Sequence, residues 1–511
     1  MSQPSILIIG AGIAGLSAGC YAQMNGWRSE IYELHSIPGG LCTSWRRRGY
    51  TFDGGVRYLS GTHPDSKVHQ LWDELKLLHE RPIYYYDEFT RYEGADGRTF
   101  HVYTEIDRLR QHMLDLAPQD AALIDEFATA LRQFTQMELP VDLTPSSAAE
   151  LMQMGRDMSP VLLPVLRWRS VTVRQFAARF RDPLLRTALP EFFQFSPPDF
   201  PMMLLLTTLA NMHDREAGYP IGGSLALARD LARQYEALGG EVHYRSRVSQ
   251  VLTKGRRSTG RSGANDIAVG VELEDGSQHV GDVILSAADG HSTIYELLGG
   301  RYLNDRIRNY YTHLPVARSL IQVSLGVARD FCHEPPSVDF PLREPITLGR
   351  TPHKRLVLKH YCFDPTMAPP GHSVLSLWCE ADYDHWKALR ADRAQYRAAK
   401  EQVAQRVIDV LEARYPGLRE QIEVVDVATP VTYERYTANW RGAFAGWALT
   451  THKMSAMMLN PMDKTLPGLE DFYMIGQWVE PGGNVELSAA SGRDVIKDLC
   501  QKEGRAFRTK S

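Results

Sequence analysis

The stretch SILIIGAGIAG, residues 5–15, decides the fold that this chain is expected to adopt. Its first five residues form a short, almost wholly apolar run of the kind that is buried inside a parallel β-sheet. Gly10, Gly12 and Gly15 follow at once with the spacing G-x-G-x-x-G, and the next residues suit a helix. A strand, a glycine-rich turn and a helix in this order predict a Rossmann-like α/β unit that binds a dinucleotide.

Each part of this unit has a physical role in holding a dinucleotide. The first glycine permits the tight turn, the second lets the backbone approach a pyrophosphate, and the third lets the helix pack closely on the strand. The N–H groups at the start of the helix, at Ile13 and Ala14, attract the phosphate charge. A second strand is expected at residues 29–33. It ends at Glu33, 23 residues after the first glycine, close to the ~20 expected for the acid that accepts hydrogen bonds from the ribose.

The composition excludes several classes of function. The chain has 511 residues, with 57 Lys and Arg against 61 Asp and Glu, and this net charge of −4 argues against a general nucleic-acid binder. The six cysteines form no C-x-x-C pair and the 17 histidines form no H-x-x-x-H pair, so we expect neither a disulfide framework nor a metal site. No apolar run approaches the ~18 residues of a membrane span. We therefore expect a cytoplasmic protein that is soluble or at most attached to a membrane surface.

Two further glycine motifs follow Glu33. A pair stands at Gly39 and Gly40, and the stretch GYTFDGG follows at residues 49–55. With these motifs the chain resembles the flavin oxidoreductases of the amine oxidase superfamily, and most of all the branch of phytoene desaturases, carotenoid isomerases and retinol saturases. The resemblance implies an FAD-binding domain, with the Gly-Gly pair near the pyrophosphate. Many members carry Arg after the pair, where this chain has Leu41, so a cationic contact would come from residues 46–48 unless that arginine triplet is a solvated turn.

A distant part of the chain extends the resemblance. The stretch YPIGGS at residues 219–224 opens a helix that is expected to run to about residue 238, with Ser224 as its N-cap. A strand is expected at residues 241–244, and Val248 matches a valine that contacts the adenosine part of FAD in the family. Residues 279–286 are also expected to be a strand, and the stretch DVILSAAD within and after it resembles the strand that returns to the nucleotide-binding sheet.

The C-terminal motif combines a buried strand at residues 471–476, the stretch QWVEPGGNVE at residues 477–486 and a helix from about residue 487. In the family the N-terminus of this helix faces the flavin ring and stabilises the charge of the reduced flavin. Gln477 replaces the usual Asp, which puts one cofactor contact in doubt. Glu486 is either a solvated helix acid or an acid that faces the substrate. The motif contains no cysteine, so the FAD is expected to be non-covalent.

These matches place the FAD-binding domain in three separated segments, residues 1–75, 215–300 and 465–511. A substrate domain is inserted between them, with a helical part at residues 76–214 and a sheet-containing part at residues 301–464. The expected fold class is therefore α/β, a Rossmann-like FAD-binding domain with a substrate domain of mixed sheet and helices, as in the amine oxidase and phytoene desaturase type. Within the sheet-containing part a helix is expected at 391–414, and strands are expected at 319–327, 355–362, 373–380 and 422–428.

Residues 105–210 are expected to be mainly helical, and two features of this part have alternative interpretations. The apolar side chains between Phe192 and Leu206 form either the wall of an apolar tunnel beside the flavin or an ordinary helical core. Residues 162–186 hold six arginines, one acid and three aromatic residues. This segment either rests on an anionic membrane surface or forms a solvated basic face.

The resemblance implies an FAD-dependent oxidoreductase acting on a hydrophobic polyene, isoprenoid or acyl substrate. Desaturation, saturation and flavin-dependent isomerisation of C–C double bonds stay open, and so does the electron acceptor. The candidate catalytic residues are Arg57, Tyr58 and Glu486. The positions assigned to FAD are Gly10, Gly12, Ile13, Ala14, Gly15, Glu33, Leu34, Gly39, Gly40, Leu41, Gly55, Val56, Arg57, Val248, Ala287, Gly476, Gln477, Gly483, Asn484 and Val485.

Two alternative functions share this fold. A non-enzymatic prenyl-binding or lipid-binding protein, similar to the guanine-nucleotide dissociation inhibitors, would hold a lipid without FAD. A flavin amine oxidase would instead hold a neutral amine between aromatic rings. The rings available for such a cage are Tyr433, Tyr436, Trp440, Trp447 and Trp478.

Overall fold

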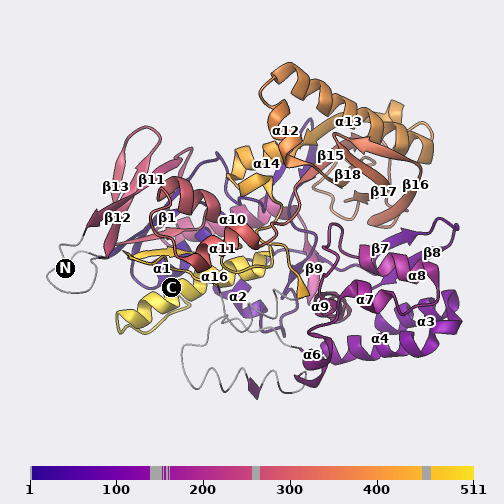
Figure 1. Cartoon of the computed structure of the whole chain (residues 1–511), viewed down its shortest axis with the longest axis horizontal. Coiled ribbons are helices and arrows are strands. Elements are labelled where there is room, and N and C mark those ends of the chain that lie inside the picture. The colour runs from indigo at the N-terminus through magenta and orange to yellow at the C-terminus, as the bar shows by residue number, and fades with distance from the viewer. Residues whose placement is uncertain are drawn as a thin grey trace.

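The computed structural model describes residues 3–137, 152, 155, 156, 159, 162–255, 265–451 and 462–510. Figure 1 shows three neighbouring groups of elements: a parallel sheet with its helices on the left, a large sheet at the upper right and a group of helices at the lower right. Most of the helical prediction for residues 105–210 falls on described residues. Its part between positions 138 and 161 lies largely outside them.

The first group is built on a five-stranded parallel sheet with the strand order β10-β2-β1-β14-β21. β1 lies at its centre and is buried over its whole length, as an almost wholly apolar strand in a parallel sheet should be. The strands expected at residues 5–9 and 241–244 are confirmed, and the three separated segments of the chain all contribute. The strands are β1 (Ser5–Ile9), β2 (Arg28–Glu33), β10 (Glu241–Tyr244), β14 (Val283–Ser286) and β21 (Phe472–Met474).

Three helices of this group approach one another through small residues. α1 (Ile13–Met24) contacts both α10 (Gly223–Ala237) and α16 (Val485–Lys502). A Cβ added to Gly19 in α1 would lie 2.7 Å from the ring of Tyr235 in α10. A Cβ added to Gly492 in α16 would lie 2.5 Å from the carbonyl oxygen of Ala14. The glycines therefore set how closely these helices pack, and through them where the start of α1 lies.

A buried ion pair ties α16 to α2 (His69–Glu74). The guanidinium of Arg493 donates to Glu74 at 2.8 Å, the hydroxyl of Tyr21 donates to the same carboxylate at 2.6 Å, and the paired side chains are only 7% and 5% exposed. Glu74→Ala is expected to lower the free energy of unfolding by about 3–5 kcal/mol, because it removes the carboxylate that faces a buried guanidinium. Urea denaturation measures this loss, with the exposed Glu80→Ala as the control. A loss below about 1 kcal/mol, typical of a surface pair, would contradict it.

A smaller sheet with the order β11-β12-β13 lies beside the parallel one, and β20 pairs with β12. The expectation of one strand over residues 279–286 is wrong, because the segment divides between β13 and β14 in different sheets. Ser5 donates its backbone N–H and its hydroxyl to Asp282, and a Cβ on Gly281 would lie 2.7 Å from the Leu7 side chain, so the chain turns here against β1. The strands are β11 (Val248–Gly255), β12 (Asp266–Leu273), β13 (Gln278–Val280) and β20 (Leu469–Glu470).

The large sheet has seven strands in the order β19-β15-β18-β17-β16-β7-β8. The four strands expected between residues 319 and 428 are present within a few residues, but β16, β7 and β8 were not expected. α13 (Arg393–Arg414) buries Val403, Val407 and Leu411 against this sheet, which confirms the helix predicted at residues 391–414. The strands are β7 (Glu88–Glu93), β8 (Thr99–Tyr103), β15 (Leu320–Val327), β16 (Ser337–Leu348), β17 (Thr351–His360), β18 (Ser373–Glu380) and β19 (Ile422–Ala428).

The helical group at the lower right of Figure 1 surrounds a core that includes Phe127, Phe176 and Trp168. Because β7 and β8 from residues 76–214 pair into the large sheet, this segment contributes strands as well as helices, and the division of the chain into domains stays a prediction. Among the described residues, no helix is both long and apolar enough to cross a membrane. The helices are α3 (Ile106–Leu116), α4 (Ala121–Phe134), α6 (Leu162–Trp168), α7 (Val173–Ala177), α8 (Pro183–Ala188) and α9 (Met202–His213).

Short elements connect the three groups. β3 and β4 form a hairpin, and β9 pairs with both β5 and β6. The strands are β3 (Ser44–Arg47), β4 (Tyr50–Asp53), β5 (Leu59–Ser60), β6 (Ile83–Tyr84) and β9 (Ala217–Pro220). Further helices are α11 (Asp305–His313), α12 (Tyr383–Leu389) and α14 (Pro430–Thr437).

Candidate functional site

The turn between β1 and α1 is built around Glu33 at the end of β2. Glu33 is buried and accepts the backbone N–H groups of Ala11 and His35, each at 2.7 Å, one on each carboxylate oxygen. Burial raises the pKa of this carboxyl group, and the two N–H groups oppose the rise. Gly10 has a φ of 98° and donates its N–H to the carbonyl of Tyr32. The acid therefore holds the turn in place, and its remaining lone pairs stay available to a ribose.

Gly12 faces open space at the start of α1. A Cβ built on Gly12 would meet no atom within 4 Å, whereas a Cβ on Gly15 would lie 2.1 Å from the carbonyl oxygen of Gly10. No side chain caps α1, so the N–H groups of its first turn, which include those of Ile13 and Ala14, are left to a ligand.

The Gly-Gly pair lies directly against this turn. Gly39 donates its N–H to the carbonyl of Ala11 at 2.8 Å, and a Cβ on Gly40 would lie 3.6 Å from the Cα of Gly12. Leu41 directly follows the pair, Leu34 directly follows Glu33, and both leucines are half-buried. The space beside Gly12, the uncapped helix and the second glycine pair together fit the pyrophosphate of a dinucleotide.

The expectation that Ser224 caps α10 is wrong. Gly222, with a φ of 97°, occupies the N-cap position, and Ser224 points instead at the buried Asp53. The carboxylate of Asp53 accepts the N–H and the hydroxyl of Ser224 at 2.9 and 2.5 Å, and also the Tyr219 hydroxyl at 2.9 Å and the Gly55 N–H at 3.0 Å. A serine whose hydroxyl is drawn to a buried carboxylate is not available to cap its own helix.

The same network positions the residues after Asp53. The Ser224 oxygen accepts the N–H of Val56 at 2.7 Å, so Gly55 and Val56 are both held from the start of α10. Val248 begins β11 and Ala287 directly follows β14, in two different sheets. Ala287 donates its N–H to Ile9 at 2.9 Å and lies next to Gly10, and Val248 is buried in the cluster that contains Tyr32. Of the predicted cofactor residues, Gly39, Gly40 and Ala287 therefore lie against the β1–α1 turn, and Gly55 lies beside Leu41.

The C-terminal motif reaches the same region through α16. A Cβ added to Gly476 would lie 3.2 Å from the Cβ of Ala14. Asn484 caps α16 by accepting the N–H of Leu487 at 3.3 Å. Gly483 and Val485 stand on either side of this cap, at the helix start. Gln477 donates to Asn439 at 3.3 Å, so its amide is engaged with protein rather than left free.

Glu486 is buried, and the interpretation as a solvated helix acid is wrong. The residue is only 6% exposed, its carboxylate accepts the Asn484 amide at 3.0 Å, and burial raises the pKa of the carboxyl group. Tyr58 lies near Glu486. Burial and the charge of Glu486 both raise the pKa of the Tyr58 phenol. The Tyr58 hydroxyl also lies 3.2 Å from that of Thr208.

Arg57 lies beside Tyr58 but faces a different set of groups. Its guanidinium carbon lies 5.5 Å from the centre of the Phe89 ring, its carbonyl accepts the Tyr86 hydroxyl at 3.0 Å, and burial lowers the pKa of the guanidinium. Arg57 and Lys359 of β17 both line one small cavity. Lys359 was not among the predicted site residues, because a lysine in a strand ordinarily faces solvent.

The arginine triplet at residues 46–48 lies on the exposed tip of the β3–β4 hairpin. Arg47 reaches Asp426 at 3.4 Å, and all three side chains are exposed. This placement favours the interpretation as a solvated turn.

A cavity of about 260 Å³ lies between the large sheet and residues 190–200. Trp378 on β18 forms part of its wall, and the pairs Arg355–Asp339 at 2.8 Å and Arg318–Glu380 lie around it. Of the apolar side chains predicted for a tunnel wall, Phe195 and Phe200 line this cavity. Phe192, Met202, Met203, Leu205 and Leu206 are instead buried in the helical core.

Three of the five aromatic rings considered for an amine cage cluster together, and the other two lie elsewhere. Trp447 lies 5.0 Å and Trp440 6.3 Å from Trp478 by ring centres, in a cluster that also contains Tyr311. Tyr433 is buried elsewhere, where its hydroxyl donates to Gln322 at 2.8 Å, and Tyr436 is 42% exposed.

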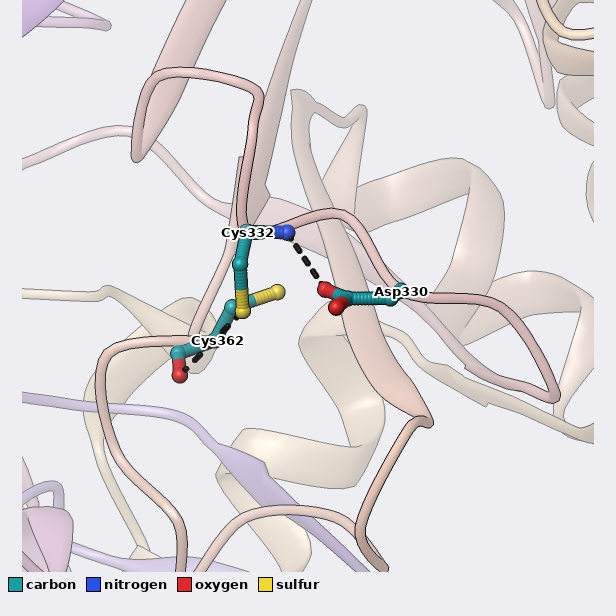
Figure 2. A group of neighbouring side chains, drawn as sticks. All are labelled: Asp330, Cys332 and Cys362. Carbon is teal, nitrogen blue, oxygen red and sulfur yellow. Dashed lines mark hydrogen bonds between the residues drawn. The ribbon is translucent and has the colours of Figure 1, made fainter.

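A separate group of side chains meets at the surface of the large sheet (Figure 2). The Asp330 carboxylate accepts the Cys332 N–H at 2.7 Å, the Cys332 thiol contacts the carbonyl of Cys362 at 3.7 Å, and the three ligand-type atoms lie within 4.8 Å of one another. Thiols and carboxylates are groups that Zn²⁺ binds. Cysteine spacing gave no signal for this group, because Cys332 and Cys362 stand 30 residues apart and meet only in the fold.

Cys362 is expected to be the first thiol alkylated by iodoacetamide at neutral pH, ahead of the more exposed Cys332. Burial raises the pKa of the Cys362 thiol, but the neighbouring His360 outweighs it and the net pKa is lowered, whereas burial and Asp330 raise the pKa of Cys332 to about 12. The thiolate is the reactive form, so the lower pKa gives the faster reaction. Peptide mass spectrometry over time measures the order, His360→Gln should slow Cys362, and earlier labelling of Cys332 would contradict the prediction.

The fold and the dinucleotide turn define the class of this protein, a flavin-dependent oxidoreductase. The chain belongs to the flavin containing amine oxidoreductase family, whose model matches residues 13–498. This family binds FAD, and the resemblance inferred from the glycine motifs is confirmed at this level.

Several proteins that are similar to this chain act on carotenoids. Prolycopene isomerase from Arabidopsis thaliana is 25% identical over 501 residues, which are 95% of this chain and 81% of that protein. The neurosporene-forming phytoene desaturase of Cereibacter sphaeroides is 26% identical and covers 98% of this chain and 95% of its own length. The lycopene-forming phytoene desaturase of Pseudescherichia vulneris is 25% identical, with 96% and 99% covered.

Solved structures share the fold at lower identity. An oxidoreductase from Methanosarcina mazei superposes with a TM-score of 0.59 at 16% identity, over 96% of this chain and all of that one. Putrescine oxidase bound to putrescine gives the same TM-score and identity over 98% and 99% of the two chains. These similarities establish the α/β flavoprotein fold.

Proposed function

We propose that this FAD-dependent oxidoreductase acts on the C–C double bonds of a hydrophobic polyene, isoprenoid or acyl substrate, by desaturation, saturation or isomerisation. The observation that carries the proposal is the similarity to prolycopene isomerase and to phytoene desaturases over nearly the whole chain. Of the rings considered for an amine cage, Tyr433 and Tyr436 lie apart from the others, and Trp447 and Trp478 are buried against one another, which favours this function over a flavin amine oxidase.

The residues around the β1–α1 turn would hold the cofactor. Gly12, the first turn of α1 and the Gly39–Gly40 pair would take the pyrophosphate, and Glu33 would accept the ribose hydroxyls. FAD, when bound, supplies the exchange of two electrons with the substrate. Apart from Arg57, the remaining cofactor residues assigned above would line the rest of its length, from Val248 and Ala287 to the cap of α16.

Two groups beside the cap of α16 are suited to proton handling. The buried carboxyl group of Glu486 has a raised pKa and so retains a proton more readily than a solvated acid. The Tyr58 phenol beside it also stays protonated, because burial raises its pKa. We propose that Glu486 holds or delivers the proton at its carboxylate, that Tyr58 positions it, and that the burial of both excludes water.

The protein is further proposed to contact an anionic membrane surface through α6. Leu162, Leu163 and Leu166 are 50%, 78% and 46% exposed, and Arg167 and Arg169 of the same short segment are exposed beside them. Apolar side chains next to cations are typical of surfaces that rest in lipid headgroups. Leu163→Glu is expected to abolish co-sedimentation with phosphatidylglycerol vesicles. Equal sedimentation of the variant and the wild type would contradict this contact.

The decisive experiment measures flavin content and turnover in one preparation. The expected result is about one FAD per chain, released on denaturation, with flavin absorbance that changes when a polyene is added without oxygen. Protein that rejects added FAD and binds a prenylated ligand would support the non-enzymatic alternative. Peroxide release with amines, and none with polyenes, would support the amine oxidase. Mass spectrometry of co-purified lipids would name the substrate.

A further inference from the structure

Lys359 carries a buried amine that has no hydrogen-bond partner. It lies on β17 between β16 and β18, its residue is 6% exposed, and its ammonium nitrogen makes no hydrogen bond. The nitrogen lies 4.0 Å from the centre of the Trp378 ring, which lines the larger cavity. A cation–π contact compensates only part of the cost of removing an ammonium group from water.

Arg57 brings a second cation to the same place. Both side chains line a small cavity of about 30 Å³, room for one small polar group, whose other walls include Tyr86, Phe89 and Tyr361. The charge of Arg57 adds to burial in lowering the pKa of the Lys359 ammonium. When both groups are charged they repel one another, and in an aromatic surrounding of low polarity this repulsion is least screened.

The acids nearby are already engaged. Asp53 is the carboxylate that favours the charge of Lys359, but it accepts four hydrogen bonds from Ser224, Tyr219 and Gly55. The phenols of Tyr86 and Tyr361 stay protonated, since burial raises the pKa of both. His360, the next residue of β17, contacts the carbonyl of Glu334 instead.

Two other cations at the large sheet, one on β17 and one on the covering helix α13, have dedicated acids. Arg355 pairs with Asp339 at 2.8 Å, and Arg414 pairs with Glu93 at 2.6 Å. The contrast indicates that Arg57 and Lys359 are kept without an acid of their own so that an anion from outside the chain completes the charge balance.

We infer that Arg57 and Lys359 bind the carboxylate of the substrate, so that the preferred substrate is a polyene or acyl chain carrying a terminal carboxylic acid. A guanidinium matches the two oxygens of a carboxylate and an ammonium adds a point charge. The apolar chain would extend past Trp378 into the larger cavity, where Phe195 and Phe200 offer apolar contact. This inference rests on the proposed function and specifies its substrate class.

The test compares cis-parinaric acid, a conjugated fatty acid, with its methyl ester. Both are titrated against the FAD-loaded protein by fluorescence. The wild type should bind the acid at least roughly tenfold more tightly, as expected for hydrogen bonds to charged groups. Lys359→Met should reduce this preference several-fold, with Arg57 still in place, by weakening binding of the acid more than binding of the ester. Lys354→Met, an exposed lysine of the same strand, should behave as the wild type. Affinity for the acid should fall as rising pH deprotonates Lys359, while affinity for the ester stays flat.

Equal affinity of the wild type for acid and ester overturns the inference without requiring any variant to fold. A preference of the same size in Lys359→Met as in the wild type overturns it as well. The inference also fails if Lys359→Met changes only the affinity of the oxidised flavin for sulfite. Such a result would mean that the cations act on the cofactor rather than on a substrate carboxylate. Flavin content and turnover of a neutral polyene are measured in the same preparation. If both are normal and the acid is not preferred, this inference fails while the proposed function stands.

Discussion

Gly12→Val is expected to weaken FAD binding by at least roughly 100-fold, or about 2.8 kcal/mol, and to leave the apoprotein folded. The position tolerates a side chain, because its φ is −70° and a Cβ there would meet no atom within 4 Å. That open space lies at the uncapped start of α1, where the pyrophosphate is proposed to approach the backbone. A valine would occupy it and hold the phosphates away from the N–H groups. Titration of apoprotein with FAD measures the affinity, and the thermal midpoint of the apoprotein checks the fold.

The matched control is Gly15→Val on the same turn. Its Cβ would lie 2.1 Å from the carbonyl oxygen of Gly10, so this variant should lose thermal stability and FAD together. Gly12→Val and Gly15→Val thus separate blocked binding from damaged packing. Wild-type FAD affinity in Gly12→Val would show that the cofactor lies elsewhere.

Asp53→Ala is expected to lower the free energy of unfolding on the order of 4 kcal/mol, because it breaks a buried hydrogen-bond network. The side chain of Asp53 accepts four hydrogen bonds, and its removal leaves the Ser224, Tyr219 and Gly55 donors without their acceptor. Its backbone carbonyl also accepts the Gln322 amide at 2.8 Å from β15 of the large sheet. Urea denaturation of the FAD-loaded protein measures the loss.

The exposed Asp65→Ala is the control for Asp53, since its side chain is 92% exposed and the change should cost little. FAD affinity should fall with Asp53→Ala as well, because Gly55 and Val56 lose the contacts that position them. A variant as stable as the wild type would mean that the network relaxes around the missing carboxylate.

The FAD-binding part was predictable because its signals are local. The apolar run of β1, the glycine spacing and the acid at the end of β2 lie within about 30 consecutive residues, and each constrains the backbone near itself. The large sheet was harder to predict. β16 contains Pro341 and Pro345 and many charges, and β7 is equally polar, so neither shows the pattern of a buried strand. They become strands through pairing with distant partners.

The candidate site shows the same division. Ser224 has the sequence of an N-cap, yet a carboxylate 171 residues away draws its hydroxyl elsewhere. Glu486 stands at a helix start and resembles a solvated acid, yet the fold buries it beside Ser60 and Tyr58. Cys332 and Cys362 meet although their spacing matches no ligand motif. In each case the partner lies far along the chain, where no local pattern predicts it.

By itself the sequence determined the cofactor class and the parallel sheet that carries it, since a glycine that must turn or approach a phosphate is restricted by its own backbone. Only the tertiary structure decided which charges are buried. Lys359 occurs in a strand whose sequence is compatible with a solvated face, and its isolation beside Arg57 arises from walls contributed by β7, β16, β17 and β18. Burial depends on all the elements that surround a side chain, and so the chemistry of the substrate pocket is fixed by the assembled fold.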